Sequence, residues 1–495
     1  MGLKSLLSLP FAKHVVRKNR YWKNNAVKVQ NELLLSLTKQ AQNTQFGKEH
    51  NFAEITNYTQ WKTNVPVRDY EGLKNYIQQI IGGEEGVLWP GVPLYFCKTS
   101  GTASGEKYIP ISKDSMPNHI TAARDAILSY IAETKNTSIV NGKMIFLQGS
   151  PELSKKGDIL TGRLSGIVAH HIPSYLMKNR LPSYKANCIK DWENKIAAIV
   201  EETLLENMSL ISGIPPWVQM YFEKLQAKTG RLIKDLFPKF DLFIYGGVTF
   251  EPYRKTFEKL IGKKVAGIEL YPASEGFIAY QDSQKEKGML LCVNHGIFYE
   301  FIPSDKFFNK NPTRISLADV QVEVNYVIIL NTNAGLWGYN IGDTIKFVSV
   351  NPYRIIVSGR IKHFTSAFGE HVIAEEVEKS LQKTVEKYPA QVNEFHVAPQ
   401  VNPGNGLPYH EWLIEFESQP NDLDAFTKKL DNELQTLNTY YKDLISGGIL
   451  KPLQLTVINK NGFRNYMKSI GKLGGQNKVP RLANDRKIAD KLNIS

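Results

Sequence analysis

The sequence has few cysteines and no long apolar run. Its three cysteines, Cys97, Cys188 and Cys292, lie far apart, and none belongs to a CxxC pair. This spacing disfavours both a disulfide framework and a zinc site, and it favours a reducing cytosol. No stretch approaches 18 uninterrupted apolar residues, so we expect no membrane-spanning helix and no membrane partner.

Targeting signals are also missing from the first twenty residues. The segment MGLKSLLSLPFAKHVVRKNR has a brief apolar patch followed by basic residues. A signal peptide would need a longer apolar region and a small-residue cleavage site. Leu6 stands where the myristoylation pattern requires Ser or Thr. The sequence therefore predicts a cytoplasmic protein.

The chain is basic, and its charge is concentrated at the two ends. The 495 residues carry a net charge of +13, of which residues 1–50 and 460–495 contribute +7 each. Clustered basic residues are typical of nucleic-acid binding, but an amphipathic helix with a solvated basic face explains the first cluster better. We expect such a helix and no nucleic-acid partner. The length, with 42% hydrophobic residues, indicates two or more domains.

The hydrophobic pattern predicts an α/β core. Helical spacing occurs over residues 12–42, 114–134, 187–207, 217–228 and 253–261, with short apolar runs between them at 143–148, 242–247 and 265–270. Alternating helices and buried strands favour parallel pairing. From 289 to 358 one strand pattern follows another with little helix, which predicts a β-rich subdomain attached to the core. No repeat of fixed period occurs.

A different pattern begins after Arg360. Residues 373–388 have a helical apolar stripe, two strand patterns follow at 392–399 and 410–417, and a helix at 421–440 precedes a strand at 453–458. We therefore expect a large N-terminal domain over 1–360 and a small α+β domain over 361–495.

The segment TSGTASGEK at 99–107 has the composition of a loop that holds phosphates. Its glycines allow backbone N–H groups to converge on an anion, and its hydroxyls and Lys107 add further donors. It is not a Walker A loop, because three residues separate Gly101 from Gly105 and Tyr108 follows the lysine. Taken alone, an ordinary flexible turn would have the same composition.

Three further segments place polar residues at the ends of predicted strands, where open α/β sheets bind ligands. ELYPASEGF puts Ser274 and Glu275 directly after a strand, GYNIGDTIKF puts Asp343 in a turn that opens a strand, and SGRIKHF follows another strand at 358–364. Each acid taken singly could be a turn or capping residue. Together with the loop at 99–107 there are four such segments, and four in this order are harder to explain as turns.

Together these segments resemble the adenylate-forming enzymes, and most closely the auxin-responsive Gretchen Hagen family of acyl-acid amido synthetases. The resembling motifs are the loop 99–107, Tyr271–Gly276, Tyr339–Asp343 and GGQNKVPR at 474–481. FGKEHNF and SGIPPWV are also similar to family sequence. The resemblance runs from about residue 10 to 490 and implies the adenylate-forming fold, with a mobile C-terminal domain.

The resemblance implies roles for individual residues in binding ATP and Mg²⁺. Glu275 resembles the Mg²⁺ ligand, Ser274 the neighbour of the reacting carboxylate, and Lys478 the mobile-domain lysine that reaches the α-phosphate. Lys362 occupies the hinge position. The implied nucleotide contacts are the phosphate loop (Ser100, Gly101, Thr102, Ser104, Gly105 and Lys107), the adenine loop (Gly246, Gly247, Val248 and Thr249) with Tyr271, and the ribose residues Asp343 and Arg360.

Three departures separate the chain from the plant members of that family. Ala103 replaces a Ser, Lys107 comes one residue early, and Asn340 replaces an Arg. Because of them, the plant acids cannot be assumed as substrates. We expect a bacterial member of the family. The expected partners are a small carboxylic acid and an amino acid. An acid–CoA ligase, which shares the first step, and a nucleic-acid-binding protein with basic termini remain the alternatives.

Overall fold

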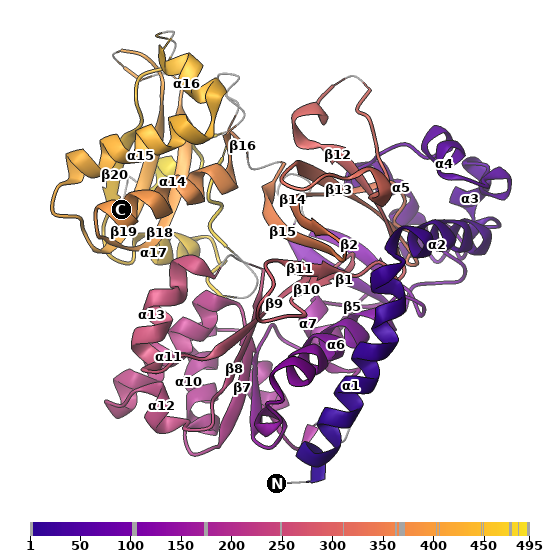
Figure 1. The fold of residues 1–495 in the computed structure, drawn as a ribbon, viewed down its shortest axis with the longest axis horizontal. Helices are drawn as coiled ribbons and strands as arrows, with labels where there is room; N and C mark the ends of the chain where they lie inside the picture. The colour runs from indigo at the N-terminus through magenta and orange to yellow at the C-terminus, as the bar shows by residue number, and fades with distance from the viewer. Residues whose placement is uncertain are drawn as a thin grey trace. The chain divides into compact units, whose positions relative to one another are not determined.

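The computed structural model describes most of the chain, in two compact units. The described residues are 3–100, 106–172, 177–247, 250–309, 311–361, 364–365, 372–401, 403–404, 406–446, 448, 450–474, 478–483 and 485–492. Unit 1 comprises residues 1–341 and 345–356, and unit 2 comprises 342–344 and 357–495 (Figure 1).

Unit 1 is built on one large mixed sheet of eleven strands. The strand order is β12-β13-β14-β15-β11-β10-β9-β8-β7-β3-β6. These strands are β3 (Lys143–Leu147), β6 (Arg180–Leu181), β7 (Met208–Gly213), β8 (Leu242–Gly246), β9 (Ala266–Ala273), β10 (Gly276–Tyr280), β11 (Met289–Leu291), β12 (Ile297–Pro303), β13 (Asn325–Thr332), β14 (Tyr339–Val350) and β15 (Tyr353–Arg360).

The two halves of this sheet differ in strand direction. Strands β6, β3, β7, β8 and β9 pair in parallel, whereas β9–β10, β10–β11, β11–β15 and β12–β13 pair antiparallel. The β-rich segment that the sequence predicts over 289–358 therefore continues the core sheet, because its first strand, β11, hydrogen-bonds directly to β10. Sequence periodicity indicates strands but does not say which sheet they join.

A second sheet in unit 1 has the order β2-β1-β5-β4. It consists of β1 (Tyr95–Ser100), β2 (Glu106–Ile111), β4 (Ser154–Lys156) and β5 (Ile159–Gly162). Strands β1 and β2 form an antiparallel hairpin in which Thr99 lies opposite Lys107. The predicted phosphate loop therefore connects two hairpin strands that each contain buried residues.

Helices cover both faces of the parallel half (Figure 1). Helices α1 and α6 pack on one face, in a core shared with β9 and β10, and α10, α11 and α13 pack on the other face against β3, β7 and β8. Unit 1 contains α1 (Leu3–Asn24), α2 (Ala26–Ala41), α3 (Gln45–Glu49), α4 (Tyr58–Asn64), α5 (Tyr70–Ile81), α6 (Met116–Thr134), α7 (Leu164–Ala169), α9 (Tyr184–Asn187), α10 (Trp192–Thr203), α11 (Pro215–Thr229), α12 (Ile233–Leu236), α13 (Glu251–Ile261) and the 3-10 turns Phe52–Glu54, Ser138–Val140, Ser304–Lys306 and Leu317–Asp319.

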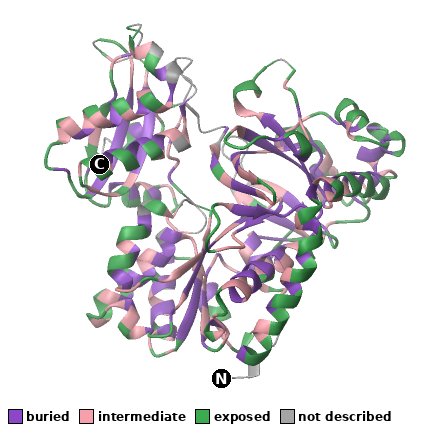
Figure 2. Ribbon diagram, in the orientation of Figure 1, coloured by how far each residue is buried: buried purple, intermediate pink, exposed green. Residues whose placement is uncertain are grey.

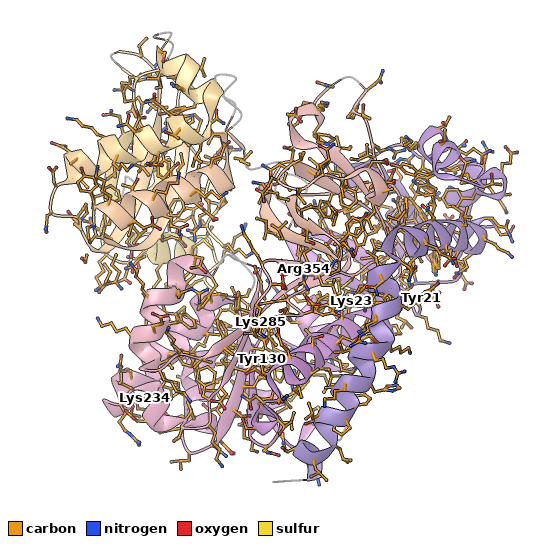
Figure 3. All side chains as sticks on the ribbon, in the orientation of Figure 1. Tyr21, Lys23, Tyr130, Lys234, Lys285 and Arg354 are labelled. Atoms are coloured by element: carbon orange, nitrogen blue, oxygen red, sulfur yellow. The ribbon has the colours of Figure 1, made fainter. Side chains whose placement is uncertain are left out.

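The helical region predicted over residues 12–42 forms two helices, α1 and α2. Residues of α1 and α2 alternate between buried and exposed (Figure 2), which agrees with the amphipathic helix expected for the first basic cluster. An ion-paired group ties α1 to the sheet, because Asp282 accepts from Lys23 at 2.7 Å and also from Arg354 on β15. Lys23 and Arg354 lie near each other in Figure 3. All three side chains are largely buried, so this contact fixes α1 on the antiparallel half.

Unit 2 is an α+β module around the three-stranded sheet β18-β19-β20. The apolar side chains of α14 and α15 pack on one face of this sheet and those of α17 and α18 on the other. The elements are β16 (Phe364–Thr365), β17 (Val372–Ile373), α14 (Ala374–Lys387), β18 (Gln391–Gln400), β19 (Tyr409–Ser418), α15 (Leu423–Leu437), α16 (Thr439–Ser446), β20 (Gln454–Ile458), α17 (Gly462–Ser469) and α18 (Ala489–Leu492). The expected α/β fold with a smaller C-terminal domain is confirmed.

Candidate functional site

The carboxyl ends of the parallel strands in unit 1 meet at one edge of the large sheet. Strand β8 ends at Gly246 beside Leu270 of β9. A side chain at Gly246 could not fit, because its Cβ would lie 2.3 Å from the Leu270 carbonyl oxygen. The Gly246-Gly247 segment therefore starts in tight contact with the strand that carries Tyr271. This is the edge at which open α/β sheets bind ligands.

Ser274 and Glu275 form the two-residue connection between β9 and β10 at that edge. The Cys97 thiol donates to the Ser274 hydroxyl across 3.1 Å, which joins strand β1 of the hairpin to the β9–β10 turn. Glu275 and the Tyr339 hydroxyl are hydrogen-bonded neighbours. Segments separated by more than 170 residues in sequence are thus brought together around Ser274 and Glu275.

The hairpin holds its lysine against an aromatic ring. The Lys107 Nζ lies 5.5 Å from the centroid of the Tyr70 ring, within the range of a cation–π contact. The Tyr70 hydroxyl accepts from the Tyr108 backbone N–H across 3.0 Å, so the first turn of α5 supports strand β2. The predicted loop residues Gly101, Thr102, Ser104 and Gly105 lie outside the described residues, and the structure describes Ser100 as the last residue of β1.

The groups around the Ser274-Glu275 turn have strongly perturbed acidity. Burial raises the pKa of the Cys97 thiol to about 12, and the charge of Glu275 acts in the same direction. Burial, followed by the Glu275 charge, also raises the pKa of Tyr339. Both groups therefore stay protonated at neutral pH, so each can donate a hydrogen bond to an oxygen atom at this edge.

Arg163 is a residue of this region that sequence reasoning missed. It directly follows Gly162, which pairs with Cys97 in the parallel register of β5 and β1. Its positive charge opposes the rise in the pKa of the Cys97 thiol. A basic residue directly after a short strand pattern was the available signal, but β5 has only four residues and was not recognised.

A carboxyl group with perturbed acidity lies beside the strand that leads to Gly246. Burial, followed by the charge of Glu251, raises the pKa of Glu269 on β9 to about 7. Glu269 lies opposite Tyr245, one residue before Gly246. Val248 and Thr249, predicted for the same loop, lie outside the described residues.

Asp343 is buried within a strand, which corrects the prediction of a turn. Strand β14 runs from Tyr339 to Val350 without interruption, although Gly342 has a φ of 86° that favours glycine. The Tyr-x-x-Gly-Asp motif has the glycine and acid composition of a turn, but here the glycine allows an irregular strand. Arg360 is the last residue of β15, and Lys362, which was predicted to be the hinge, lies outside the described residues.

Lys478 belongs to unit 2, and its side chain is exposed. The segment that follows it is fixed to β18. Val397 donates its N–H to the Arg481 carbonyl at 2.9 Å and accepts from the Ala483 N–H at the same distance. The lysine therefore precedes a backbone segment with a defined position in unit 2.

The Glu275 carboxylate in unit 1 fits one of the ways in which proteins bind Mg²⁺. Among the described residues no group of three or more His, Cys, Asp or Glu side chains could form a protein-only metal site. Mg²⁺ commonly binds one or two carboxylates together with substrate phosphates. The Glu275 carboxylate, which is close enough to Cys97 of the hairpin to raise the pKa of its thiol, suits that second arrangement.

Comparison with known proteins decides the family. Three family models match: the GH3 family N-terminal domain over residues 17–190, the central domain over 290–360 and the C-terminal domain over 375–487. The chain belongs to the GH3 family. Within the described residues, no helix of this GH3 protein is both long and apolar enough to cross a bilayer.

Relatives in the GH3 family are distant but span almost the whole chain. The jasmonoyl–L-amino acid synthetase JAR6 of Nicotiana attenuata is 22% identical and covers 92% of this chain and 91% of its own length. The indole-3-acetic acid-amido synthetase GH3.4 of Arabidopsis thaliana is also 22% identical, with 92% and 89% covered.

Solved structures show the same fold at low identity. The GH3.15 acyl acid amido synthetase in complex with 2,4-DB matches with a TM-score of 0.80 and 16% identity over 98% of this chain and 96% of its own. A 2-hydroxyisobutyryl-CoA ligase in its postadenylation state matches with a TM-score of 0.58 and 11% identity over 94% and 92%. The fold is thus that of adenylate-forming enzymes.

Proposed function

We propose that this GH3 protein is an ATP-dependent acyl-acid amido synthetase. It adenylates a carboxylic acid with release of pyrophosphate and then transfers the acyl group to an amino acid. The observation that carries the proposal is the Cys97–Ser274 contact, which joins the phosphate hairpin to the Ser274-Glu275 turn. The family membership and the adenylate-forming fold support it.

In this proposal, the N-terminal domain over residues 1–360 binds ATP and the acid. The hairpin residues Ser100, Gly101, Thr102, Ser104, Gly105 and Lys107 bind the phosphates, and Gly247, Val248, Thr249 and Tyr271 border the adenine. Asp343 accepts hydrogen bonds from the ribose hydroxyls, with Arg360 nearby. The functional domains run over 1–360 and 361–495, and the chain is proposed to be a bacterial member of the family.

The first half-reaction gathers negative charge around the α-phosphorus as the carboxylate attacks. Glu275 would hold Mg²⁺, which supplies Lewis-acid stabilisation of the phosphate oxygens when bound. Backbone N–H groups of the hairpin loop and the Lys478 ammonium neutralise further charge, and one such donor is worth about 3 kcal/mol. Ser274 lies beside the acid, with its hydroxyl oriented by Cys97.

The second half-reaction needs an amine in place of pyrophosphate. The small C-terminal domain rotates about Lys362 between the two half-reactions and removes Lys478 from the site. Conformational steps of this kind complete or dismantle a catalytic site without changing its fixed residues. The three cysteines are unpaired thiols, which supports the cytosol as the place of this reaction.

An acid–CoA ligase is the second candidate, because a CoA ligase shares the fold. Its first half-reaction is the same, so a pyrophosphate-release screen of carboxylic acids tests both. Each acid is run with an amino acid mixture, with CoA, and with neither. Jasmonate, indole-3-acetate and 2,4-DB enter the panel because relatives carry their names.

The expected result is turnover that depends on one acid and on amino acids, with the amide as product. Acid-dependent turnover that requires CoA would replace the amide synthetase by the ligase. Folded protein that releases no pyrophosphate with any acid, and binds no ATP, would overturn both.

A further inference from the structure

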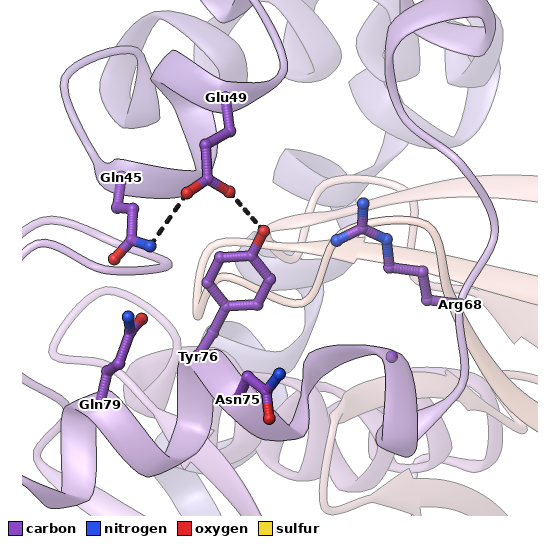
Figure 4. Close-up of a pocket in the computed structure, with 7 residues that line it drawn as sticks. Gln45, Glu49, Arg68, Asn75, Tyr76 and Gln79 are labelled. Carbon is purple, nitrogen blue, oxygen red and sulfur yellow. Dashed lines mark hydrogen bonds between the residues drawn. The ribbon is translucent and has the colours of Figure 1, made fainter.

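A polar groove in unit 1 has no part in the proposed reaction. Seven residues from α3, α5 and the segment before α5 line a volume of about 410 Å³, which lies in the range of small-molecule sites. The lining residues are Gln45, Glu49, Arg68, Gly72, Asn75, Tyr76 and Gln79. Apart from Gly72, every one of them has a side chain with a polar group (Figure 4).

The groove presents one charge of each sign on either side of a tyrosine hydroxyl. The Tyr76 hydroxyl donates to a Glu49 oxygen, and the Gln45 amide donates to the other at 2.9 Å. The hydrogen bond from Tyr76 holds the pKa of Glu49 below its usual value, and the Arg68 charge adds to this. Glu49 is therefore ionised at neutral pH, and each of its oxygens keeps a lone pair for another donor.

Arg68 faces the same hydroxyl from the opposite side (Figure 4). Its guanidinium donates to the His50 Nε2 at 2.7 Å and stacks 4.9 Å from the Phe46 ring centroid. His50 offers an acceptor at Nε2 because its other ring nitrogen donates to the Phe46 carbonyl, so the His50 ring is neutral. Burial, with the Arg68 charge, lowers the pKa of His50 and keeps it so.

The Arg68 stem lies over the first turn of α5. A Cβ at Gly72 would lie 3.0 Å from the Arg68 Cβ, so glycine leaves room for the arginine to cross the helix. The guanidinium is therefore already in position before a ligand binds. This reduces the side-chain entropy that is lost on binding.

Gln79 supplies an independent sign of a ligand. Its Oε1 is buried and has no hydrogen-bond partner among the described residues, although a buried acceptor without a donor costs about 1–3 kcal/mol. In Figure 4 the Gln79 amide rises from α5 toward Gln45 on the Glu49 side of the groove. Because this oxygen has almost no accessible surface, a ligand donor near Glu49 would reach it only after the Gln79 amide turns toward the groove.

We propose that the groove binds a small zwitterion of the α-amino acid class with a polar side chain. Its carboxylate pairs with Arg68, its ammonium pairs with Glu49 and Gln79, and the remaining amides contact its side chain. A ligand with a single charge would meet an unfavourable like charge on one side of Tyr76. Binding goes beyond the proposed function, because it requires neither ATP nor an acyl acid.

The groove is joined to the candidate active site through backbone hydrogen bonds. Arg68 donates its N–H to the Gly338 carbonyl at 2.8 Å and accepts from the Asn340 N–H at 2.7 Å. These bonds flank Tyr339, whose hydroxyl neighbours Glu275. Occupancy of the groove should therefore stabilise the segment that precedes Asp343 on β14.

Isothermal titration calorimetry of the full chain without ATP tests the proposal. The probes are L-glutamine, glutaramate, which lacks the ammonium, and glutamine amide, which lacks the carboxylate. L-glutamine should bind with a saturable isotherm, and each single-charge analogue should bind at least about tenfold more weakly, the cost of one hydrogen bond to a charged group.

Glu49→Gln and Gln79→Leu identify the site. Each should weaken L-glutamine binding at least about tenfold while the melting temperature shows that the variant is folded. Glu71→Gln is the matched control on α5, because Glu71 pairs with Lys74 outside the groove, and it should leave binding unchanged.

Three outcomes would overturn the proposal. They are no saturable binding at millimolar L-glutamine, equal binding of glutaramate, and binding that neither groove variant changes, which would place L-glutamine in an acceptor site instead. None of these results depends on adenylation, so the proposed function is tested separately.

Discussion

The candidate groups of the two units differ in how far their side chains are buried. In unit 1, Cys97 is fully buried and hydrogen-bonded to Ser274, and Glu275 neighbours the hydroxyl of the buried Tyr339. In unit 2, Lys478 is exposed. Prepositioned groups suit the binding of a nucleotide that must be held throughout a reaction. An exposed lysine suits a group needed for one step.

The backbone behind Lys478 is nevertheless well fixed. Val479 and Leu482 are buried, and the Pro480 carbonyl lies 2.6 Å from the His396 Nδ1. The contrast is therefore between side chains and not between a rigid unit and a loose one. The predictions below test that contrast from the largest expected effect to the smallest.

Lys478→Ala should have the largest effect. We expect the first half-reaction to slow by about 10²–10³-fold, the cost of losing one preorganised donor. Transfer from a synthetic acyl-adenylate to the amine should change much less, because the proposed rotation has removed the lysine by then. Single-turnover rates from acid plus ATP and from the adenylate measure the two steps.

Lys487→Ala is the control for net charge. Lys487 lies in the same basic segment and pairs with Asp485 at the surface, so its loss should leave both rates near the wild type. Equal losses in both half-reactions of Lys478→Ala would mean that the lysine acts on fold or charge and that the two-conformation mechanism has the wrong residue.

Asp343→Ala should weaken ATP binding by about 1.5–3 kcal/mol, the range for a hydrogen bond to a charged group. The buried carboxylate is proposed to accept from the ribose hydroxyls, so the preference for ATP over 2′-deoxy-ATP should shrink in the variant. The measurement is equilibrium binding of both nucleotides. If wild type and variant discriminate equally, Asp343 does not contact the ribose.

The sequence predicted the elements of this comparison better than their connections. Periodicity located β3, β8 and β9, and the residues after β9 were correctly expected at a strand end. It did not indicate the Cys97–Ser274 contact, since no local pattern encodes a contact between residues 177 positions apart. Short elements such as β5 and α3 also escaped, because four or five residues contain too few turns or alternations to show a period.

The groove near α5 was missed for a related reason. Its lining comes from two helices and the segment before one of them, and its residues are those of ordinary solvated helix faces. Only the fold places Glu49 and Arg68 on either side of Tyr76. Asp343 shows the opposite error, because turn composition suggested a turn where the chain remains a strand.

Glu269→Gln tests whether the buried carboxyl group of Glu269 lowers the stability of unit 1. Burial raises the pKa of Glu269 from 4.5 to about 7 in the folded chain. Between these values the unfolded chain has lost the proton that the folded chain keeps, so stability falls as pH rises from 5 to 8. The variant should escape this loss and gain about 1–3 kcal/mol relative to wild type over that range.

Urea unfolding of both proteins at pH 5, 6, 7 and 8 measures this difference. The advantage of Glu269→Gln should grow with pH and level off above 7. An advantage that is constant with pH would show that Glu269 has an ordinary acidity in the folded chain.

Cys97→Ala should have the smallest effect. It tests whether the Cys97 thiol orients the Ser274 hydroxyl. Removal of the thiol leaves the Ser274 hydroxyl without the donor that lies 3.1 Å away. A neutral hydrogen bond contributes about 0.5–1.5 kcal/mol, so adenylation should slow by about 2- to 10-fold with little change in ATP affinity. Cys97→Ser should recover most of the rate, because serine retains a donor of similar size. Since burial holds the pKa of the thiol near 12, iodoacetamide at pH 8 should not inactivate the wild type through this residue. A serine variant as slow as the alanine variant would show that Cys97 acts by packing against β5, and Ser274 would then be positioned by the β9–β10 turn alone.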